Sequence, residues 1–208
     1  MYEESAIALP DYFFALQADC QKYEAKTFGK AKKYALCPLF KLFDENEFAK
    51  VYMAWAEDAL YFQIVVQTEE IKVSYPDVNK GDSIELFIDT KNLKSAKLTH
   101  RFCHHFYFLP ELCEGRQAGE ITRFRTEDVH PLASPHDLEV KSTISKRGYE
   151  LFITIPEKCL VGFEPETSKA IGFSYRINRS NSEPQLFAHS HGDALDQHPD
   201  LWPTLHLC

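Results

Sequence analysis

The stretch VYMAWAEDALYFQIVV, residues 51–66, has the pattern of an antiparallel β-hairpin. Apolar side chains stand at every second position on both sides of a polar turn at residues 56–59: Val51, Met53, Trp55, Leu60, Phe62, Ile64 and Val66. Successive side chains of a strand point to opposite faces, so each arm can bury one face and keep the other polar. The hairpin therefore predicts a sheet with one face in a core.

Further segments with strand character follow this hairpin at regular spacing. The expected strands are 81–89, 101–109, 119–126, 138–145, 149–156, 170–178, 184–190 and 202–207, with a turn at 146–148. Residues 11–23 fit a strand or a helix, and a short helix can follow Pro156. About nine or more strands with turn signals between them predict an all-β fold, an antiparallel β-sandwich or jelly roll with minor helical pieces.

Length and composition fit one globular domain. The chain has 208 residues, of which 44% are hydrophobic and 26% charged, and its 13% aromatic content favours strands. β-Sandwiches often exceed the usual domain size, so we expect a single domain over 1–208. Residues 1–34 are expected to be an N-terminal segment that packs on the sandwich.

Charge and cysteine usage exclude several classes of partner. The net charge of -8, with scattered Lys and Arg, argues against nucleic acid. The N-terminus is acidic where a signal peptide is basic, and no apolar run is long enough for a bilayer, so we expect a cytoplasmic protein without a membrane partner. Six cysteines without a Cys-x-x-Cys pair are expected to be mostly reduced and buried, with Cys208 a free exposed thiol.

The order of several motifs resembles a known family. They are WAEDALYF at 55–62, GDSIELFID at 81–89, YELFITIP at 149–156, IGFSYRIN at 171–178 and LWPTLHL at 201–207. Together they are similar to the family 9 carbohydrate-binding modules and the wider DOMON-like β-sandwiches, over roughly residues 35–207. No single motif is specific, but their order and spacing are moderately so.

The resemblance implies a β-sandwich that binds glycan ends, often with structural calcium. In the family two tryptophans clamp a sugar and a strand glutamate hydrogen-bonds it, and Glu85 matches that glutamate. The clamping positions fall near Asn79 and His189, so both tryptophan platforms are absent. Wider relatives bind haem through Met and His, but Met53, the only internal methionine, alternates as a core residue. No cofactor other than a possible calcium ion is expected.

Strand alternation independently predicts a binding face. Residues Glu85, Phe87 and Asp89 share one face of their strand, and His105, Tyr107, Arg176 and Asn178 fall on the matching faces of two others. Aromatic rings stack on sugar C–H groups, and carboxylate, amide and guanidinium groups pair with hydroxyls. The predicted ligand-binding residues of a shallow saccharide site are Glu85, Tyr107, Arg176, Asn178, His189 and Trp202. We expect Glu85→Ala to abolish glycan binding with thermal stability nearly unchanged.

Structural explanations compete with this prediction. Charged residues on a strand face are usually solvated or form cross-strand ion pairs. A loop or the N-terminal segment can cover Phe87 and Tyr107 and make them a second small core, and Trp55 is expected in the main core. A sandwich that has lost sugar binding and serves as a protein-interaction domain is therefore the alternative function.

Catalysis is not expected. Glu85 and Asp89 are four strand residues, or roughly 13 Å, apart, more than the 5–9.5 Å of glycosidase carboxyl pairs. No nucleophile or phosphate-loop motif is present. A minority possibility is a metal-dependent hydrolase in which His189, His191 and Asp193 bind a transition metal. His104 and His105 are adjacent, so they should point to opposite sides of their strand.

Overall fold

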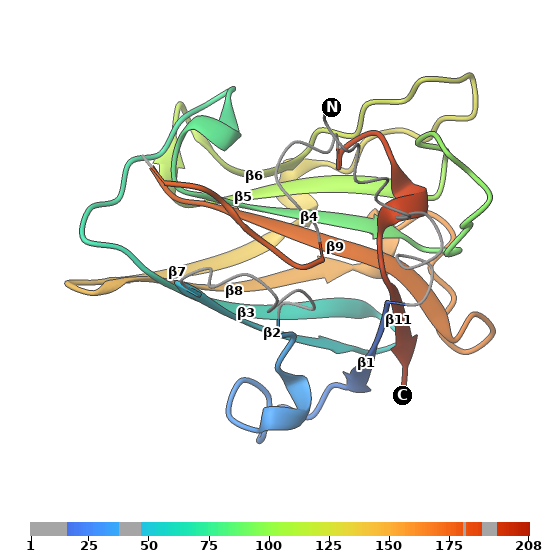
Figure 1. Ribbon diagram of the computed structural model, residues 1–208, viewed down its shortest axis with the longest axis horizontal. Helices are drawn as coiled ribbons and strands as arrows, with labels where there is room; N and C mark the ends of the chain where they lie inside the picture. Colours follow the sequence, from blue (N-terminus) through green and yellow to red (C-terminus); the bar gives the residue numbers. More distant parts are fainter. Residues whose placement is uncertain (1–15, 38–46, 181, 189–194) are drawn as a thin grey trace, which may run out of the picture.

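The computed structural model describes residues 16–37, 47–180, 182–188 and 195–208. Strands dominate these residues, and the only helical pieces among them are single turns of 3-10 helix. The strands form two layers that face each other (Figure 1). This arrangement confirms the predicted all-β sandwich.

Eleven strands are formed by the described residues. Their bounds are β1 Gln17–Lys22, β2 Ala49–Trp55, β3 Ala59–Gln67, β4 Ser83–Asp89, β5 Cys103–Cys113, β6 Arg116–Glu120, β7 Glu139–Ser145, β8 Gly148–Pro156, β9 Ala170–Asn178, β10 Gln185–Leu186 and β11 Thr204–Leu207. The 3-10 turns are η1 Lys32–Tyr34, η2 Val78–Lys80, η3 Pro135–Asp137, η4 Glu157–Cys159 and η5 Pro199–Leu201.

One layer has the strand order β6-β5-β4-β9-β11, with β10 also paired to β9, and the other has the order β2-β3-β8-β7. Strand β1 joins them, because Gln17–Cys20 pair with β11 and Gln21–Lys22 pair with β2. Both of these pairings are parallel, whereas every other strand pair is antiparallel. The sheet is therefore mixed, which corrects the prediction of a purely antiparallel sandwich.

The hairpin predicted over residues 51–66 is present as β2 and β3. Val51 pairs with Ile64 and Met53 with Phe62, and the turn closes through a hydrogen bond from Ala56 N–H to the Ala59 carbonyl. The alternating apolar residues of both arms are buried in the main core, Met53 and Trp55 among them. The predicted core positions of this hairpin are confirmed.

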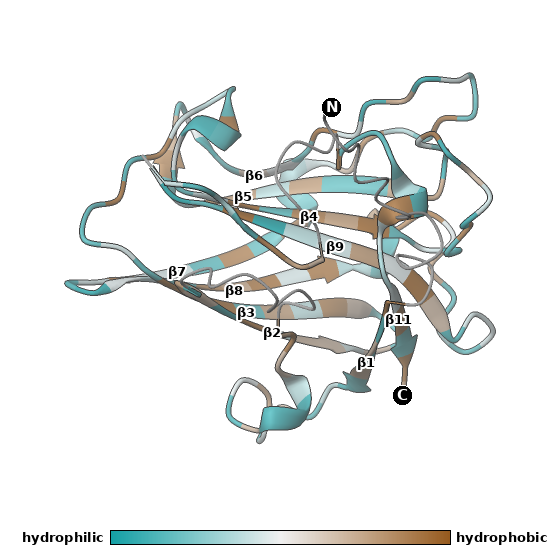
Figure 2. Ribbon diagram, viewed as in Figure 1, coloured by the Kyte–Doolittle hydropathy of each residue, from teal (hydrophilic) through white to brown (hydrophobic). Residues whose placement is uncertain are grey.

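The main core lies between the two layers. Ile84, Leu86 and Ile88 point inward from β4 and belong to the same buried cluster as Ile153 and Ile155 of the opposite layer. Bands of apolar and polar colour alternate along β4, β5 and β8 (Figure 2). The face of β4 that points away from this core carries Glu85, Phe87 and Asp89, as the alternation predicts.

Several predicted segments have different bounds in the structure. The expected strand 119–126 ends at Glu120, because the Thr122 hydroxyl takes the His105 N–H at 2.8 Å in place of a backbone carbonyl. The expected strand 202–207 begins only at Thr204, since Pro203 has no N–H and Trp202 closes η5.

Three other segments were predicted only in part. Of 184–190, only β10 is paired, and residues 189 and 190 lie outside the described residues. Of 11–23, the strand β1 forms, and residues 11–15 lie outside the described part. The helix expected after Pro156 is the single turn η4.

All six cysteines are unpaired, as expected for a reduced chain. Three of them, Cys20, Cys103 and Cys159, are buried, and Cys208 is exposed as predicted. Within the part of the chain that is described, no helix is long and apolar enough to cross a membrane.

Candidate functional site

The strands β5, β4 and β9 lie side by side and bring most of the predicted site residues together. Glu85 in the middle strand pairs with Tyr107 on one side and with Arg176 on the other. Ser83, two residues earlier, pairs with Asn178. The predicted residues Glu85, Tyr107, Arg176 and Asn178 therefore share one region of the sheet face that points away from the main core.

The Glu85 carboxylate is the centre of this region. Arg176 donates from Nε to Oε1 and from Nη2 to Oε2, both at 2.7 Å. Asn178 Nδ2 donates to Oε1 at 2.7 Å, and His105 Nε2 lies 2.8 Å from Oε2. Four hydrogen bonds from three side chains thus fill the carboxylate, including a bidentate guanidinium pair.

Burial and charge act in opposite directions on Glu85. Burial alone raises the pKa of this carboxyl group, but hydrogen bonds from His105 and Arg176 and their charges outweigh it and bring the pKa to about 2. Burial likewise lowers the pKa of Arg176, and Glu85 more than reverses that effect. The pair is therefore ionised at every ordinary pH.

The face is not the shallow solvent-exposed surface predicted from the sequence. Glu85, Tyr107 and Asn178 are buried, with exposed fractions of 1%, 2% and 5%. The Arg176 side chain is 21% exposed. The prediction of an exposed face is wrong because two loop segments pack over it. Of the described site residues, Arg176 alone retains a substantial exposed edge.

The first covering segment runs before β4 and packs on Tyr107. Tyr107 is buried with Val78 and Leu109, and its ring centroid lies 5.9 Å from that of the half-buried Tyr75. Gly119, opposite Tyr107 in β6, leaves room for the ring, since a Cβ there would meet it at 2.8 Å. Burial raises the pKa of Tyr107 to about 12, and Tyr75 adds to the effect.

The second covering segment runs before β11 and packs on Phe87. Trp202 is 1% exposed, donates from Nε1 to the Leu195 carbonyl and lies 5.8 Å from the Phe87 ring. Phe87 in turn stacks on His105 at 4.3 Å. Phe87 and Tyr107 therefore belong to small satellite cores, as the structural alternative predicts, and Trp202 does not present an open ring.

The remaining predicted residues are not placed. His189, His191 and Asp193 lie outside the described residues, so both the sugar contact of His189 and the minority metal set stay predictions. His105 was missing from the predicted set although it contacts Glu85. Its alternation with Tyr107 on the same strand face was the signal that could have included it.

A second polar group lies on the inner side of the same layer. His104 Nδ1 and His130 Nε2 lie 3.0 and 2.9 Å from the same oxygen, Oε1 of Glu120. The Thr122 hydroxyl donates to that oxygen at 2.7 Å, and Ala133 N–H donates to Oε2 at 2.6 Å. His104 and His105 thus point to opposite sides of β5, as predicted.

Burial also governs the acid–base behaviour of this inner group. Burial raises the pKa of Glu120, but hydrogen bonds from His104 and His130 outweigh it and bring the pKa to about 2. Burial lowers the pKa of His104. Glu120 is therefore an ionised carboxylate, and His104 favours its neutral form.

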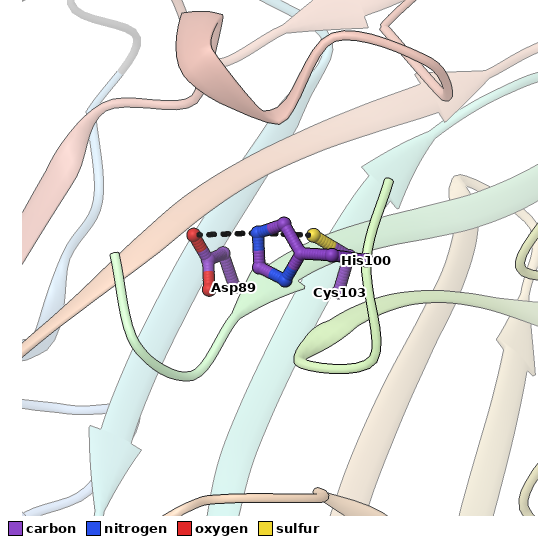
Figure 3. Close-up of side chains that lie close together, drawn as sticks. All are labelled: Asp89, His100 and Cys103. Carbon is purple, nitrogen blue, oxygen red and sulfur yellow. Dashed lines mark hydrogen bonds and ion pairs between the residues drawn. The ribbon is translucent and has the colours of Figure 1, made fainter. Parts of the chain in front are cut away.

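A third polar group, Asp89, His100 and Cys103, lies at the end of β4 (Figure 3). His100 Nε2 lies 3.3 Å from Cys103 Sγ and 3.7 Å from Asp89 Oδ2. The Asp89 carboxylate also accepts N–H groups of Lys91 and Leu93, at 3.0 and 2.6 Å. These bonds close the turn that follows β4.

The family resemblance implies a structural calcium ion, which needs a group of oxygen ligands. Among the described residues, two groups of three His, Cys, Asp or Glu ligands are close enough to share an ion, and both contain histidine. Calcium takes six to eight oxygen ligands. Neither group fits calcium, and a calcium site stays a prediction.

Known proteins support the fold and the family pattern. A family model described as "Carbohydrate family 9 binding domain-like" matches residues 25–191. Among solved structures, a family 9 carbohydrate-binding module from Caldicellulosiruptor kristjanssonii in complex with cellotriose is similar at a TM-score of 0.67 and 16% identity, covering 92% of this chain and 93% of the other. A family 9 module from the same organism in complex with glucose is similar at a TM-score of 0.64 and 15% identity, covering 92% of this chain and 95% of the other.

A putative carbohydrate-binding protein from Bacteroides uniformis is similar at a TM-score of 0.55 and 13% identity, covering 93% of this chain and 98% of the other. At these identities the structural likeness shows the fold. No curated protein matches the sequence.

Proposed function

Because the chain belongs to the carbohydrate family 9 binding domain-like family, we propose that it is a non-catalytic domain that binds a saccharide on the outer face of β5, β4 and β9. The observation that carries this proposal is the convergence of Arg176, Asn178 and His105 on Glu85. Planar groups held in fixed positions at one place are what hydroxyl recognition requires.

We infer different roles for these residues from their burial and contacts. Glu85 has no acceptor site left for a ligand, so it holds the guanidinium, amide and imidazole groups in place. Arg176 has the exposed edge and lies 5.7 Å from the Phe87 ring, which supports its guanidinium from below. The half-buried Tyr75 offers a partly exposed ring beside Tyr107, the residue that pairs with Glu85. We assign Arg176 and Tyr75 to ligand contact, and Tyr107, Asn178 and Trp202 to support.

Glucose and cellotriose are the first probes, since the similar Caldicellulosiruptor module was solved with both. A glycan array followed by calorimetry on the positive glycans should show binding to the wild-type chain. Arg176→Gln introduces an amide that can reach Glu85 but removes the charged guanidinium group. We therefore expect at least about tenfold weaker glycan binding, which is a loss of about 1.4 kcal/mol in the free energy of binding.

Arg179→Gln is the matched control. Arg179 follows β9 closely, but it stacks on Phe48 at 4.4 Å and donates to Ser182 and the Gln67 carbonyl, away from Glu85. This variant should bind glycans like the wild type. Equal losses in both variants would refute the assigned location, and a wild-type chain that binds no glycan would refute the function.

The alternative is a protein-interaction domain that has lost sugar binding. The burial of Glu85 and Trp202 favours it, because both contribute to packing in the absence of a ligand. A negative array would shift the preference to this function. A cytoplasmic location is part of the proposal, supported by six unpaired cysteines, which fit a reducing compartment.

A further inference from the structure

Three side chains able to ligate a metal meet inside the sandwich, on the side of β5 opposite the proposed saccharide site. His104 lies on β5, Glu120 is the last residue of β6, and His130 lies in the following loop. Their side chains are at most 3% exposed, and one ligand atom from each lies within 4.8 Å of the others. The group is thus preassembled from three separate segments.

The hydrogen bonds of His130 fix the state of its ring. Nδ1 lies 2.7 Å from the Arg101 carbonyl, and a carbonyl can only accept, so Nδ1 carries a proton. In the neutral ring Nε2 then has a lone pair, and it points at the Glu120 carboxylate 2.9 Å away. Two lone pairs that face each other need a cation between them, either a proton or a metal ion.

The Glu120 Oε1 atom is also crowded. It has contacts at 3.0 Å or less with Thr122, His104 and His130, whereas a carboxylate oxygen offers about two acceptor sites. A single ion shared by the two imidazoles and this oxygen replaces two of the three hydrogen bonds. Oε2 is held separately by Ala133 N–H, which keeps the carboxylate oriented.

We propose that His104 Nδ1, His130 Nε2 and Glu120 Oε1 bind one divalent transition-metal ion, best matched by Zn²⁺. Two imidazole nitrogens and one carboxylate oxygen are zinc ligands in proteins, and a water molecule completes four-coordination. Tetrahedral ligands about 2.0 Å from zinc are roughly 3.3 Å apart, so the 2.9 and 3.0 Å separations need to widen by only a few tenths of an ångström.

The surroundings resemble those of metal ligands. The Arg101 carbonyl orients His130, and Thr122 and Ala133 orient Glu120, as outer partners do around a metal. His104 Nε2 has no hydrogen-bond partner among the described residues, so nothing prevents it from carrying the single proton of the neutral ring. Nδ1 is then left to bind the ion.

The Asp89, His100 and Cys103 group makes a useful contrast (Figure 3). There His100 Nδ1 accepts the Phe102 N–H at 3.3 Å, so Nε2 carries the ring proton and donates it to Cys103 Sγ. A protonated Nε2 has no lone pair for an ion. This group is satisfied by hydrogen bonds alone and is assigned no metal.

The test measures metal content and does not depend on sugar binding. Full-length protein is stripped with a chelator, reloaded with Zn²⁺ and passed through gel filtration, and zinc is measured per chain. We expect about one zinc ion per wild-type chain. At a hundredfold excess over the dissociation constant, zinc should raise the melting temperature by roughly 5–10 °C.

Two variants locate the ion. His130→Gln should weaken zinc binding at least about 100-fold, since a direct ligand is lost. His136→Gln, at an exposed position in η3, is the matched control and should keep one zinc per chain. Zinc content below about 0.1 per wild-type chain, or equal binding by both variants, would overturn the proposal.

A spectroscopic measurement on the wild type covers the case in which His130→Gln does not fold. Cobalt in place of zinc should give the visible bands of a tetrahedral site without a thiolate-to-cobalt band in the near ultraviolet. A thiolate band would place the ion at a cysteine, such as Cys103 in the contrasting group, and would refute the assignment to His104, Glu120 and His130.

Discussion

Glu85 shows how one side chain can organise a site without touching the ligand. A carboxylate offers about four acceptor sites, and Arg176, Asn178 and His105 fill four between them. A sugar hydroxyl could reach this carboxylate only by displacing one of these donors. Glu85 therefore acts on any ligand through the groups that it holds, above all Arg176.

We predict that Glu85→Ala strongly destabilises the fold. The substitution leaves the largely buried Arg176 guanidinium without its anion and with unmade hydrogen bonds, and breaking a buried pair in this way costs about 3–5 kcal/mol. This replaces the sequence-based expectation of nearly unchanged thermal stability. Urea denaturation monitored by Trp fluorescence measures the change in the free energy of unfolding.

Glu57→Ala is the control for this prediction. Glu57 pairs with Lys22 at 3.0 Å, but both side chains are more than half exposed, so its loss should hardly change the free energy of unfolding. If Glu85→Ala lost no more stability than Glu57→Ala, the buried carboxylate would not be holding its neighbours as we describe.

At this scale the sequence predicts which residues share a face but not what covers that face. Alternation alone places Glu85, Arg176 and Asn178 on matching sides of their strands, and the structure brings them together. The aromatic rings of Phe87 and Tyr107 suggested that a loop or the N-terminal segment covers them. The covering loops have no periodicity, so the pattern did not predict which segments these are or that Trp202 is buried in one of them.

The bounds of strands with regular alternation could be predicted closely. Residues 170–178 form β9 with the expected bounds, and the hairpin of β2 and β3 differs by two residues or fewer at each end. The local sequence of a strand does not indicate which strand it pairs with when that partner is distant in the chain. The parallel position of β1 between β11 and β2 depends on the approach of the two chain ends, which no alternation pattern encodes.

The β7–β8 hairpin depends on a glycine at the start of β8. Gly148 has φ +131°, and a Cβ there would lie 2.0 Å from the Val66 carbonyl of the neighbouring β3. Gly148→Ala therefore strains the backbone by about 1–2 kcal/mol and forces the strands apart, at a further cost of about 1–3 kcal/mol. Chemical denaturation should measure the sum of these two costs as a loss in the free energy of unfolding.

Gly115→Ala separates the two contributions. Gly115 also has a positive φ, +75°, but a Cβ there meets nothing within 4 Å. This variant should lose only the backbone part, about 1–2 kcal/mol. Equal losses at the two positions would show that the β3 and β8 strands yield to the added methyl group without cost.

Two buried carboxylates lie on opposite sides of one layer of the sandwich. Glu85 is on the outer face and Glu120 on the inner face, and β5 carries a histidine toward each. Thr122 joins them, because its hydroxyl accepts the His105 N–H and donates to Glu120. Changes at the inner group can therefore shift the backbone that positions His105 in the proposed saccharide site.

Glu85 should make the global stability of the protein depend on pH. The pKa of Glu85 is about 2 in the folded protein, below the ordinary value of 4.5. As the pH falls from about 5 to 2, the unfolded chain takes up a proton at this residue and the folded chain does not, so the free energy of unfolding falls. The contribution is complete above about pH 5 and is on the order of 3 kcal/mol.

Comparing the wild type with Glu85→Gln isolates this residue, because the other carboxylates titrate in both proteins. Urea midpoints at pH 6 and pH 3 should differ more in the wild type than in the variant. High salt should leave this difference in place, since the pair is buried and poorly screened, while it weakens exposed pairs such as Lys22 with Glu57. Identical pH profiles would mean that Glu85 titrates alike in the folded and unfolded chains, against the ion pair with Arg176.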